Sequence, residues 1–183
     1  MKIKVYIQKI NPDLKFPKVL DKADWVDLYA SQTIKFKAPQ SGTLKSRTVN
    51  GQEEKYRNVT FDGKLIPLGV SILAPDGFEC QLVARSSTAF GMGIVQANCL
   101  GIIDGGPYGY NSAKDEWKFP AWAMRDTTIT AGERICQFRI VPSQKATFWQ
   151  KLKWLFSNGI ELIEVEELPA KDARGGFGTT GKY

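Results

Sequence analysis

Residues 65–84, Leu-Ile-Pro-Leu-Gly-Val-Ser-Ile-Leu-Ala-Pro-Asp-Gly-Phe-Glu-Cys-Gln-Leu-Val-Ala, indicate the fold class of this chain. Two apolar runs, Leu65–Leu73 and Phe78–Ala84, flank the tetrapeptide Ala74-Pro75-Asp76-Gly77. Proline presets the backbone angle that a turn needs, and glycine adopts the left-handed conformation that often follows it. The stretch therefore predicts two strands joined as a β-hairpin.

Short strands are also expected on both sides of this stretch. Residues 2–7 and 134–141 alternate apolar and polar side chains, which is typical of a strand with one buried face. Residues 160–165 are expected to form the last strand. Many short strands separated by turns favour an all-β fold, a distorted jelly-roll β-barrel or a similar closed architecture.

Two surface insertions, at about 39–60 and about 143–158, depart from the strand pattern. The first is polar and contains Asn50-Gly51, which predicts a surface excursion or hairpin. The second predicts one short inserted helix at about 145–157, packed on the barrel or on a partner subunit. Lysines and tryptophans there leave a membrane or nucleic-acid surface as less favoured alternatives. The apolar residues of this second insertion recur with helical spacing: Phe148, Trp149, Leu152, Leu155 and Phe156.

Composition places the chain among globular proteins. Its 183 residues, 43% hydrophobic and 24% charged, fit one domain at 1–169 followed by a glycine-rich arm at 170–183. The apolar runs are far shorter than the roughly 20 residues that cross a bilayer. We therefore expect a soluble protein of the cytoplasm, or of the host-cell cytoplasm if the source is viral, with no membrane and no nucleic acid as partner.

The absence of histidine restricts the chemistry. It excludes Ser-His-Asp and Cys-His nucleophiles and most zinc sites. Cys80, Cys99 and Cys136 lie far apart, and we expect all three to be buried. Acid–base chemistry then falls to carboxylates, and Mg²⁺ is the expected metal because it prefers oxygen ligands. A net charge of +6 favours an anionic partner, a phosphorylated small molecule at least as well as a nucleic acid.

The chain ends in a glycine-rich tail, Arg174-Gly175-Gly176-Phe177-Gly178-Thr179-Thr180-Gly181 followed by two more residues. This tail is unsuited to a core element, because it holds four glycines and little apolar surface. Its amide and hydroxyl groups, with the Arg174 guanidinium, are suited to phosphate oxygens. Phe177 can stack on a flat ring. We interpret the tail as a flexible arm that closes over a ligand; the alternative is a frayed terminus.

Five segments stand out in a fixed order along the chain: Ala23–Leu28, Ala84–Thr88, Asn98–Asp104, Gly132–Gln137 and the glycine-rich tail. Together they resemble the sequence motifs of the homotrimeric dUTPases, which hydrolyse dUTP. The match extends from about residue 22 to 181 and includes Asp24-Trp25, as in a variant branch of the family.

The resemblance implies a role for each matching residue. Asp104 and Gln137 would be catalytic, with Asp104 deprotonating and orienting the attacking water, and Asp27 would touch Mg²⁺ through water. The residues implied for the phosphates are Arg85, Ser86, Ser87, Arg174, Thr179 and Thr180. Those implied for uracil and deoxyribose are Asn98, Gly101, Ile103, Pro107, Tyr108 and Phe177. Pro107 stands where the family has a sugar-stacking tyrosine, so either it or Tyr108 packs on deoxyribose.

The implied reaction converts dUTP to dUMP and pyrophosphate by attack of water at the α-phosphorus. It keeps uracil out of DNA and supplies dUMP for dTMP synthesis. The resemblance further implies a homotrimer whose active sites are shared between subunits. Two alternatives are a dCTP deaminase-like enzyme of the same fold and a non-catalytic or regulatory role with a protein partner. The deaminase is disfavoured because residues 117–124 contain no carboxylate.

Overall fold

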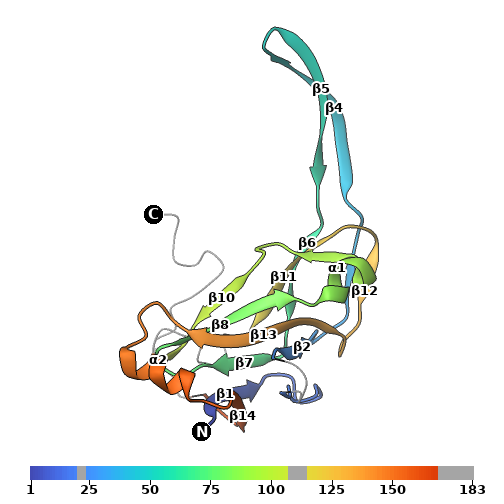
Figure 1. Cartoon of the computed structure of the whole chain (residues 1–183). Helices are drawn as coiled ribbons and strands as arrows, with labels where there is room; N and C mark the ends of the chain where they lie inside the picture. Colours follow the sequence, from blue (N-terminus) through green and yellow to red (C-terminus); the bar gives the residue numbers. More distant parts are fainter. Residues whose placement is uncertain (20–23, 107–114, 169–183) are drawn as a thin grey trace.

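Figure 1 shows the computed structural model, which describes residues 1–19, 24–106 and 115–168. Within these ranges the chain is mostly strand with two short helices, which confirms the all-β prediction. The elements are β1 (Ile3–Lys9), β2 (Val26–Tyr29), β3 (Ile34–Phe36), β4 (Gln40–Val49), β5 (Gln52–Thr60), β6 (Gly63–Pro67), β7 (Val70–Leu73), β8 (Phe78–Ala84), α1 (Ser86–Met92), β9 (Ile94–Gln96), β10 (Gly101–Asp104), β11 (Lys118–Ala123), β12 (Thr127–Ile129), β13 (Arg134–Pro142), α2 (Phe148–Leu155) and β14 (Ile160–Val165).

Three larger sheets and the two-stranded sheet β12-β3 form the body of the molecule. The strand orders of the three larger sheets are β10-β8-β13-β2, β14-β1-β7 and β6-β11-β9. The pairing of β1 with β14 is parallel, while the other strand pairs within these sheets are antiparallel. The inward side chains of all three sheets meet in one core, in which Ile7, Phe119 and Phe138 are fully buried. The half-buried strands expected at 2–7, 134–141 and 160–165 are confirmed as β1, β13 and β14.

The hairpin predicted for residues 65–84 is wrong. β7 pairs with β1, and β8 pairs with β10 and β13, so the turn at Pro75 carries the chain from one sheet to another. The first apolar run is also split at Gly69, whose φ of 65° ends β6 before β7 begins. A Cβ at Gly69 would lie 2.5 Å from the Leu14 side chain, so only glycine fits there. Turn chemistry predicted the reversal, but burial in two different sheets decided the pairing.

The first insertion is a two-stranded arm that projects from the body, as the upper part of Figure 1 shows. β4 and β5 pair along their length, and nearly all of their residues are exposed. Asn50 and Gly51 connect them with positive φ angles of 52° and 79°. Two central residues with positive φ are characteristic of the hairpin turn that matches strand twist. The prediction of a surface hairpin is confirmed.

The second insertion contains α2, shorter than the predicted 145–157. Thr147 caps its first turn by accepting a hydrogen bond from the Gln150 amide. Trp154 packs on Phe78 with ring centroids 5.9 Å apart. Most of the predicted apolar face does not lie on the barrel: Phe148, Trp149, Leu155 and Phe156 are 69–74% exposed. The helix therefore packs on the barrel through Trp154, and packing of its exposed apolar residues on a partner subunit stays a prediction.

Candidate active site

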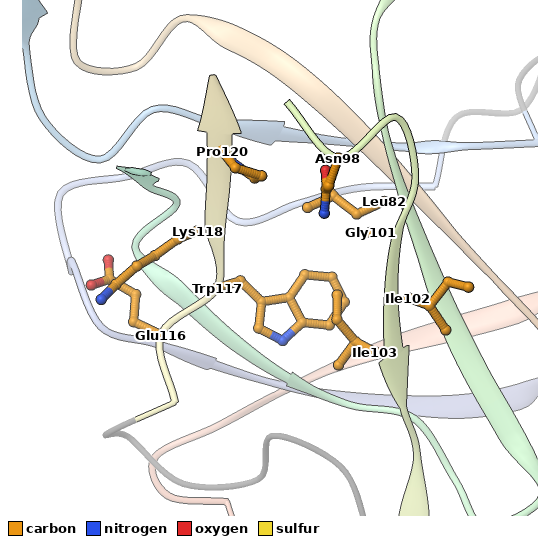
Figure 2. A pocket seen from close by; sticks show the side chains of 9 residues that line it. All are labelled: Leu82, Asn98, Gly101, Ile102, Ile103, Glu116, Trp117, Lys118 and Pro120. Atoms are coloured by element: carbon orange, nitrogen blue, oxygen red, sulfur yellow. The ribbon is translucent and has the colours of Figure 1, made fainter. Parts of the chain in front are cut away.

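A pocket of about 200 Å³ lies between β10 and β11 (Figure 2). We call it the β10–β11 pocket. It brings together Asn98, Gly101 and Ile103, three of the residues predicted from the sequence, around an apolar wall. Its full lining is Leu82, Asn98, Gly101, Ile102, Ile103, Glu116, Trp117, Lys118 and Pro120.

Backbone pairing places the walls of this pocket. Gly101 faces Leu82 across the β10–β8 pair, where a Cβ would approach the Leu82 Cβ to 3.2 Å. On the other side, the Trp117 amide donates to Val70 O, and Trp117 O accepts from the Leu68 amide, both at 2.9 Å. Trp117 is buried, and its Nε1 has no hydrogen-bond partner within the described ranges. The sequence analysis did not predict that Trp117 lines the site.

Gln96, the last residue of β9, was not predicted as part of the site. Its Nε2 donates to Leu82 O at 3.1 Å and to Asn98 Oδ1 at 2.9 Å. Its Oε1 is buried without a partner among the residues that the structure describes. The only available signal was an amide side chain that ends the apolar run Ile94-Val95, two places before Asn98.

The loop between β9 and β10 corrects the prediction for the cysteines. Cys99 is exposed and has a φ of 57°, because the chain reverses there between two strands. Cys80 and Cys136 are buried, as predicted. Burial raises the pKa of both thiols well above the ordinary value, because it disfavours the charged thiolate. Only Cys99 therefore lies where a solvent reagent can reach it.

Asp104 ends β10 and borders a second, larger hollow of about 770 Å³, which we call the Asp104 hollow. Its side chain is exposed, as is that of Ile102 on the same face of the strand. Gly101 and Ile103 are less exposed and alternate with them. The hollow is lined by Asp76, Gly77, Phe78, Glu79, Ile102, Asp104, Gly105, Ser143, Gln144, Lys145, Thr147 and Gln150.

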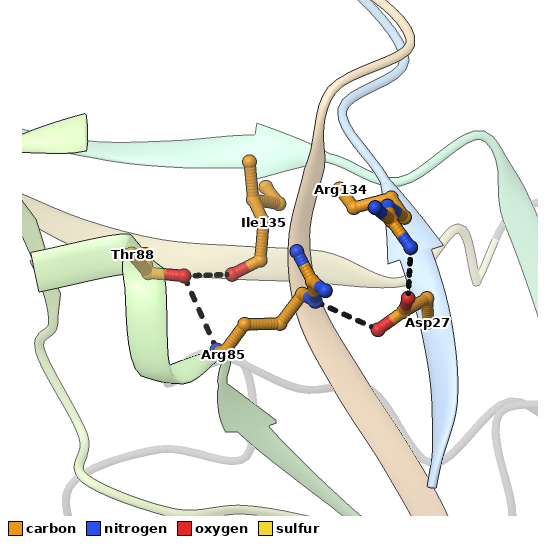
Figure 3. A network of polar contacts seen from close by, with 5 residues as sticks. All are labelled: Asp27, Arg85, Thr88, Arg134 and Ile135. Atoms are coloured by element: carbon orange, nitrogen blue, oxygen red, sulfur yellow. Dashed lines mark hydrogen bonds and ion pairs between the residues drawn. The ribbon is translucent and has the colours of Figure 1, made fainter. Parts of the chain in front are cut away.

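A charged cluster forms at the far end of the same sheet (Figure 3). Asp27 on β2 pairs through Oδ1 with Arg85 Nε at 2.8 Å, and through Oδ2 with Arg134 Nη1 at 3.1 Å. We call these three residues the arginine cluster. The Asp27 side chain is only 13% exposed, so both guanidinium groups are held by a carboxylate largely shielded from water. Gln137 lies beside it, because Gln137 and Asp27 are directly paired on β13 and β2.

Ser86 and Ser87 open α1, a helix that the sequence analysis did not predict. Thr88 fixes this turn: its hydroxyl donates to Ile135 O at 2.7 Å and accepts from the Arg85 amide at 3.2 Å. The first amide groups of a helix have no partner within it. A helix of seven residues containing Gly91 is too short to show an apolar period, which is why the pattern failed here.

The two groups of predicted residues lie at opposite ends of β8. Asp104 is paired with Glu79 at the start of this strand, and Arg85 and Ser86 follow its last residue. At about 3.3 Å per residue, the six positions from Glu79 to Arg85 span roughly 20 Å. Within one chain, Asp104 therefore does not meet the arginine cluster. Pro107, Tyr108, Arg174, Phe177, Thr179 and Thr180 lie outside the described residues.

No group of three or more acidic or cysteine side chains that could hold a metal ion is found within residues 1–19, 24–106 and 115–168. No helix in the same ranges is long and apolar enough to cross a membrane. The single carboxylate of the arginine cluster is Asp27.

Comparison with known proteins shows the family of this chain and supports its all-β fold. No protein-family model matches the chain. The chain is 36% identical over 162 residues to the SPbeta prophage-derived deoxyuridine 5'-triphosphate nucleotidohydrolase of Bacillus subtilis, covering 88% of this chain and 87% of the relative. Among solved structures it resembles the dUTPase of Streptococcus mutans, with a TM-score of 0.57 and 22% identity over 77% of this chain and 98% of that one.

It also resembles a mutant dUTPase from phage phi11 of S. aureus, which coordinates a structural Mg(II) ion, with a TM-score of 0.56 and 13% identity over 79% of this chain and 94% of that one. The fold is thus an all-β fold of the jelly-roll type found in these dUTPases. The chain belongs to the dUTPase family. The expected fold and enzyme class are both confirmed.

Proposed function

We propose that the protein hydrolyses dUTP to dUMP and pyrophosphate by attack of an Asp104-activated water at the α-phosphorus. This activity would keep uracil out of DNA and supply dUMP for dTMP synthesis. One observation carries the proposal: a base-sized pocket on β10 is followed directly by an exposed carboxylate on the same strand. The name of the B. subtilis relative supports dUTP as the substrate.

The β10–β11 pocket has the size and lining for a pyrimidine base. Pockets for whole drug-sized ligands measure about 300–1,000 Å³. A volume of about 200 Å³ accommodates a base and leaves the phosphates outside. The walls at Leu82, Ile103 and Trp117 are apolar, while Asn98 and the backbone of β10 supply polar groups for the base edge.

Asp104 acts as the general base in this proposal. Carboxylates are weak bases, so its contribution is mainly to hold and orient one water molecule. Its place after Ile103 puts it beyond the base, where the α-phosphate of a bound nucleotide would extend. The surrounding Asp104 hollow is large enough for phosphates and for protein groups that contact them.

The arginine cluster and the first turn of α1 form the phosphate shell. Arg85 and Arg134 supply guanidinium donors, and Ser86 and Ser87 add hydroxyl and amide groups at the start of a helix. Asp27 pairs with both arginines but neutralises only one of their two positive charges. Triphosphate oxygens would take over some of these contacts, and Gln137 beside Asp27 would contact the α-phosphate or the water.

Mg²⁺ fits this donor set only as an ion carried by the triphosphate. Mg²⁺ keeps several waters and takes one or two carboxylates together with substrate phosphates. Asp27 is a single carboxylate, and the described residues form no three-ligand cage, which agrees with contact through water. When bound, the ion would neutralise charge on the leaving pyrophosphate.

The active site is shared between copies in a homotrimer, in our proposal. The separation of roughly 20 Å along β8 supports this arrangement, because Asp104 and Ser86 of one chain cannot reach one phosphorus. A neighbouring copy would bring its arginine cluster to the Asp104 hollow. Each copy then contributes to two different sites.

The tail would complete the site by closing over the nucleotide. Phe177 would cover the uracil, while Arg174, Thr179 and Thr180 would contact the phosphates, and either Pro107 or Tyr108 would pack on deoxyribose. A chain that ends after Ala173 should keep its oligomeric state and lose turnover, because closure excludes bulk water. Steady-state kinetics and light scattering measure the two properties, and a fully active truncation would remove the tail from the mechanism.

A nucleotide panel tests the proposal. With Mg²⁺, the protein should release pyrophosphate from dUTP and hardly at all from dCTP, dTTP or UTP. Release of ammonia from dCTP would indicate the deaminase instead, although β11, where that chemistry needs a carboxylate, has none. Absence of hydrolysis of every nucleotide would leave a non-catalytic role with a protein partner.

A further inference from the structure

We propose that Gln96 is a positioning residue that selects uracil over cytosine by fixing the side-chain amide of Asn98. The inference rests on the function proposed above and concerns the β10–β11 pocket. Gln96 does not line that pocket itself; it acts through Asn98, which does.

The orientation of Gln96 is fixed by the backbone. Its Nε2 lies 3.1 Å from Leu82 O, and a carbonyl oxygen can only accept a hydrogen bond. The amide nitrogen, and not the oxygen, must therefore face Leu82. Turning the amide over would bring two oxygens together, and the side chain is only 9% exposed, so water cannot relieve that contact.

Gln96 in turn fixes Asn98. The same Nε2 donates to Asn98 Oδ1 at 2.9 Å, so the Asn98 oxygen must face Gln96. The Asn98 Nδ2 group then points the other way, and Figure 2 shows this nitrogen turned toward the side of the pocket that holds Trp117. Within the described ranges, Nδ2 makes no hydrogen bond to the protein. The pocket therefore offers a donor, and the donor cannot be exchanged for an acceptor by a simple amide rotation.

A fixed donor discriminates between the two pyrimidines. Uracil carries an oxygen at position 4 that accepts a hydrogen bond, whereas cytosine carries an amino group that donates one. With Asn98 Nδ2 directed at position 4, uracil is paired and cytosine leaves two donors facing each other. Polar groups that lose water on binding and find no partner produce large discrimination between otherwise similar ligands.

Two substitutions and one matched control test the relay, by which we mean the hydrogen bonds that link Leu82 O through Gln96 to Asn98. Gln96→Met removes the donor and frees the Asn98 amide to rotate. Gln96→Glu, protonated so that it can donate to Leu82 O, offers only an acceptor oxygen to Asn98, whose amide then turns to donate to it and presents Oδ1 to the base. The control is Gln8→Met, because Gln8 is also 9% exposed but lies on β1, where its Oε1 accepts from the Leu168 amide at 3.3 Å.

The readout is the ratio of kcat/KM for dUTP to that for dCTP. Gln96→Met should lower this ratio about 10- to 100-fold, mainly through KM for dUTP, and Gln96→Glu should lower it further. Gln8→Met should leave it unchanged. A folded Gln96→Met enzyme with the wild-type ratio would overturn the inference. The proposed function fails separately, if the wild-type protein releases no pyrophosphate from dUTP.

Substrate analogues provide a measurement that needs no folded variant. Sulfur is a weaker hydrogen-bond acceptor than oxygen, so the wild-type enzyme should lose more kcat/KM with 4-thio-dUTP than with 2-thio-dUTP. An equal loss, or a larger loss with the 2-thio compound, would show that Asn98 does not read position 4 and would overturn the assignment.

Discussion

The two ends of β8 differ in almost every physical property. At one end, β10 and β11 enclose a small, largely apolar pocket that leads to the exposed Asp104. At the other end, Asp27 holds Arg85 and Arg134 in a cluster of charges. One end suits a neutral base, and the other suits polyanionic phosphates. A nucleotide needs both, yet one strand keeps them roughly 20 Å apart.

On the proposed function, this difference means that each chain would carry two half-sites rather than one site. Each half-site is organised by its own contacts: the relay from Leu82 through Gln96 to Asn98 at one end, and the Asp27 ion pairs at the other. If the proposed function holds, joining them requires a second copy of the chain, and we expect assembly to be a condition for activity.

The largest expected effect is on the Asp104 half-site. Asp104→Asn should reduce kcat at least about 10²-fold, because the attacking water loses its positioned base. Nucleotide affinity should stay close to that of the wild type, since Asn is isosteric and the pocket is untouched. Single-turnover kinetics and isothermal titration with a non-hydrolysable analogue measure the two quantities. Wild-type turnover would remove Asp104 from this role.

The next effect should appear in the arginine cluster. Asp27→Asn leaves two guanidinium groups without their carboxylate, so the free energy of unfolding should fall by about 1–3 kcal/mol, as for hydrogen bonds to charged groups. Turnover should fall about tenfold as Arg85 loses its fixed position.

Asp24→Asn is the matched control for this variant. Asp24 lies 3.9 Å from Arg139 and its side chain is 83% exposed, so its loss should change stability by less than about 1 kcal/mol. Equal losses of stability in the two variants, measured by urea unfolding, would show that Asp27 is no more important than a surface charge.

A smaller difference is expected between the reactivity of Cys99, in the loop before β10, and that of the two cysteines in the core. A thiol reagent at pH 8 should label Cys99 in the native protein and reach Cys80 and Cys136 only after unfolding. Burial raises the pKa of the two core thiols, so they stay protonated at that pH as well as shielded. Rapid labelling of three thiols in the native protein would contradict the described packing.

The smallest effect is expected for the projecting arm. Replacing residues 41–59 by a short Gly-Ser linker should leave kcat/KM for dUTP unchanged and alter the free energy of unfolding by less than about 1 kcal/mol, because nearly all of these side chains are exposed. Enzyme kinetics and thermal unfolding provide the check. A large loss of activity would place the arm in one of the half-sites.

Sequence patterns predicted where the strands lie better than they predicted which strands pair with each other. Alternation identified β1 and β13 because one face of each is buried, and Asn50-Gly51 identified the arm hairpin because few other pairs adopt its backbone angles. The partner of β8 could not be predicted. Pairing depends on which distant strand completes the core, and a local turn contains no information on that choice.

In the candidate site, too, some residues could be predicted from the sequence and others could be found only in the structure. The motif residues were found because their order is distinctive, and the structure brings Asn98, Gly101 and Ile103 together. Gln96 and Trp117 were missed because a buried amide or indole looks like ordinary core in a sequence. Only the hydrogen bond between Gln96 and Asn98 shows its relation to the site.

The most direct test of the central claim mixes two inactive variants. Asp104→Asn lacks the base, and Ser86→Ala weakens the phosphate shell, so each homotrimer should be nearly inactive. When both chains are refolded together in equal amounts, about a quarter of the shared sites should combine an intact Asp104 with an intact Ser86 from a neighbour. We predict recovery of about a quarter of wild-type turnover. Turnover no higher than the sum of the separate variants would contradict a site built from two copies.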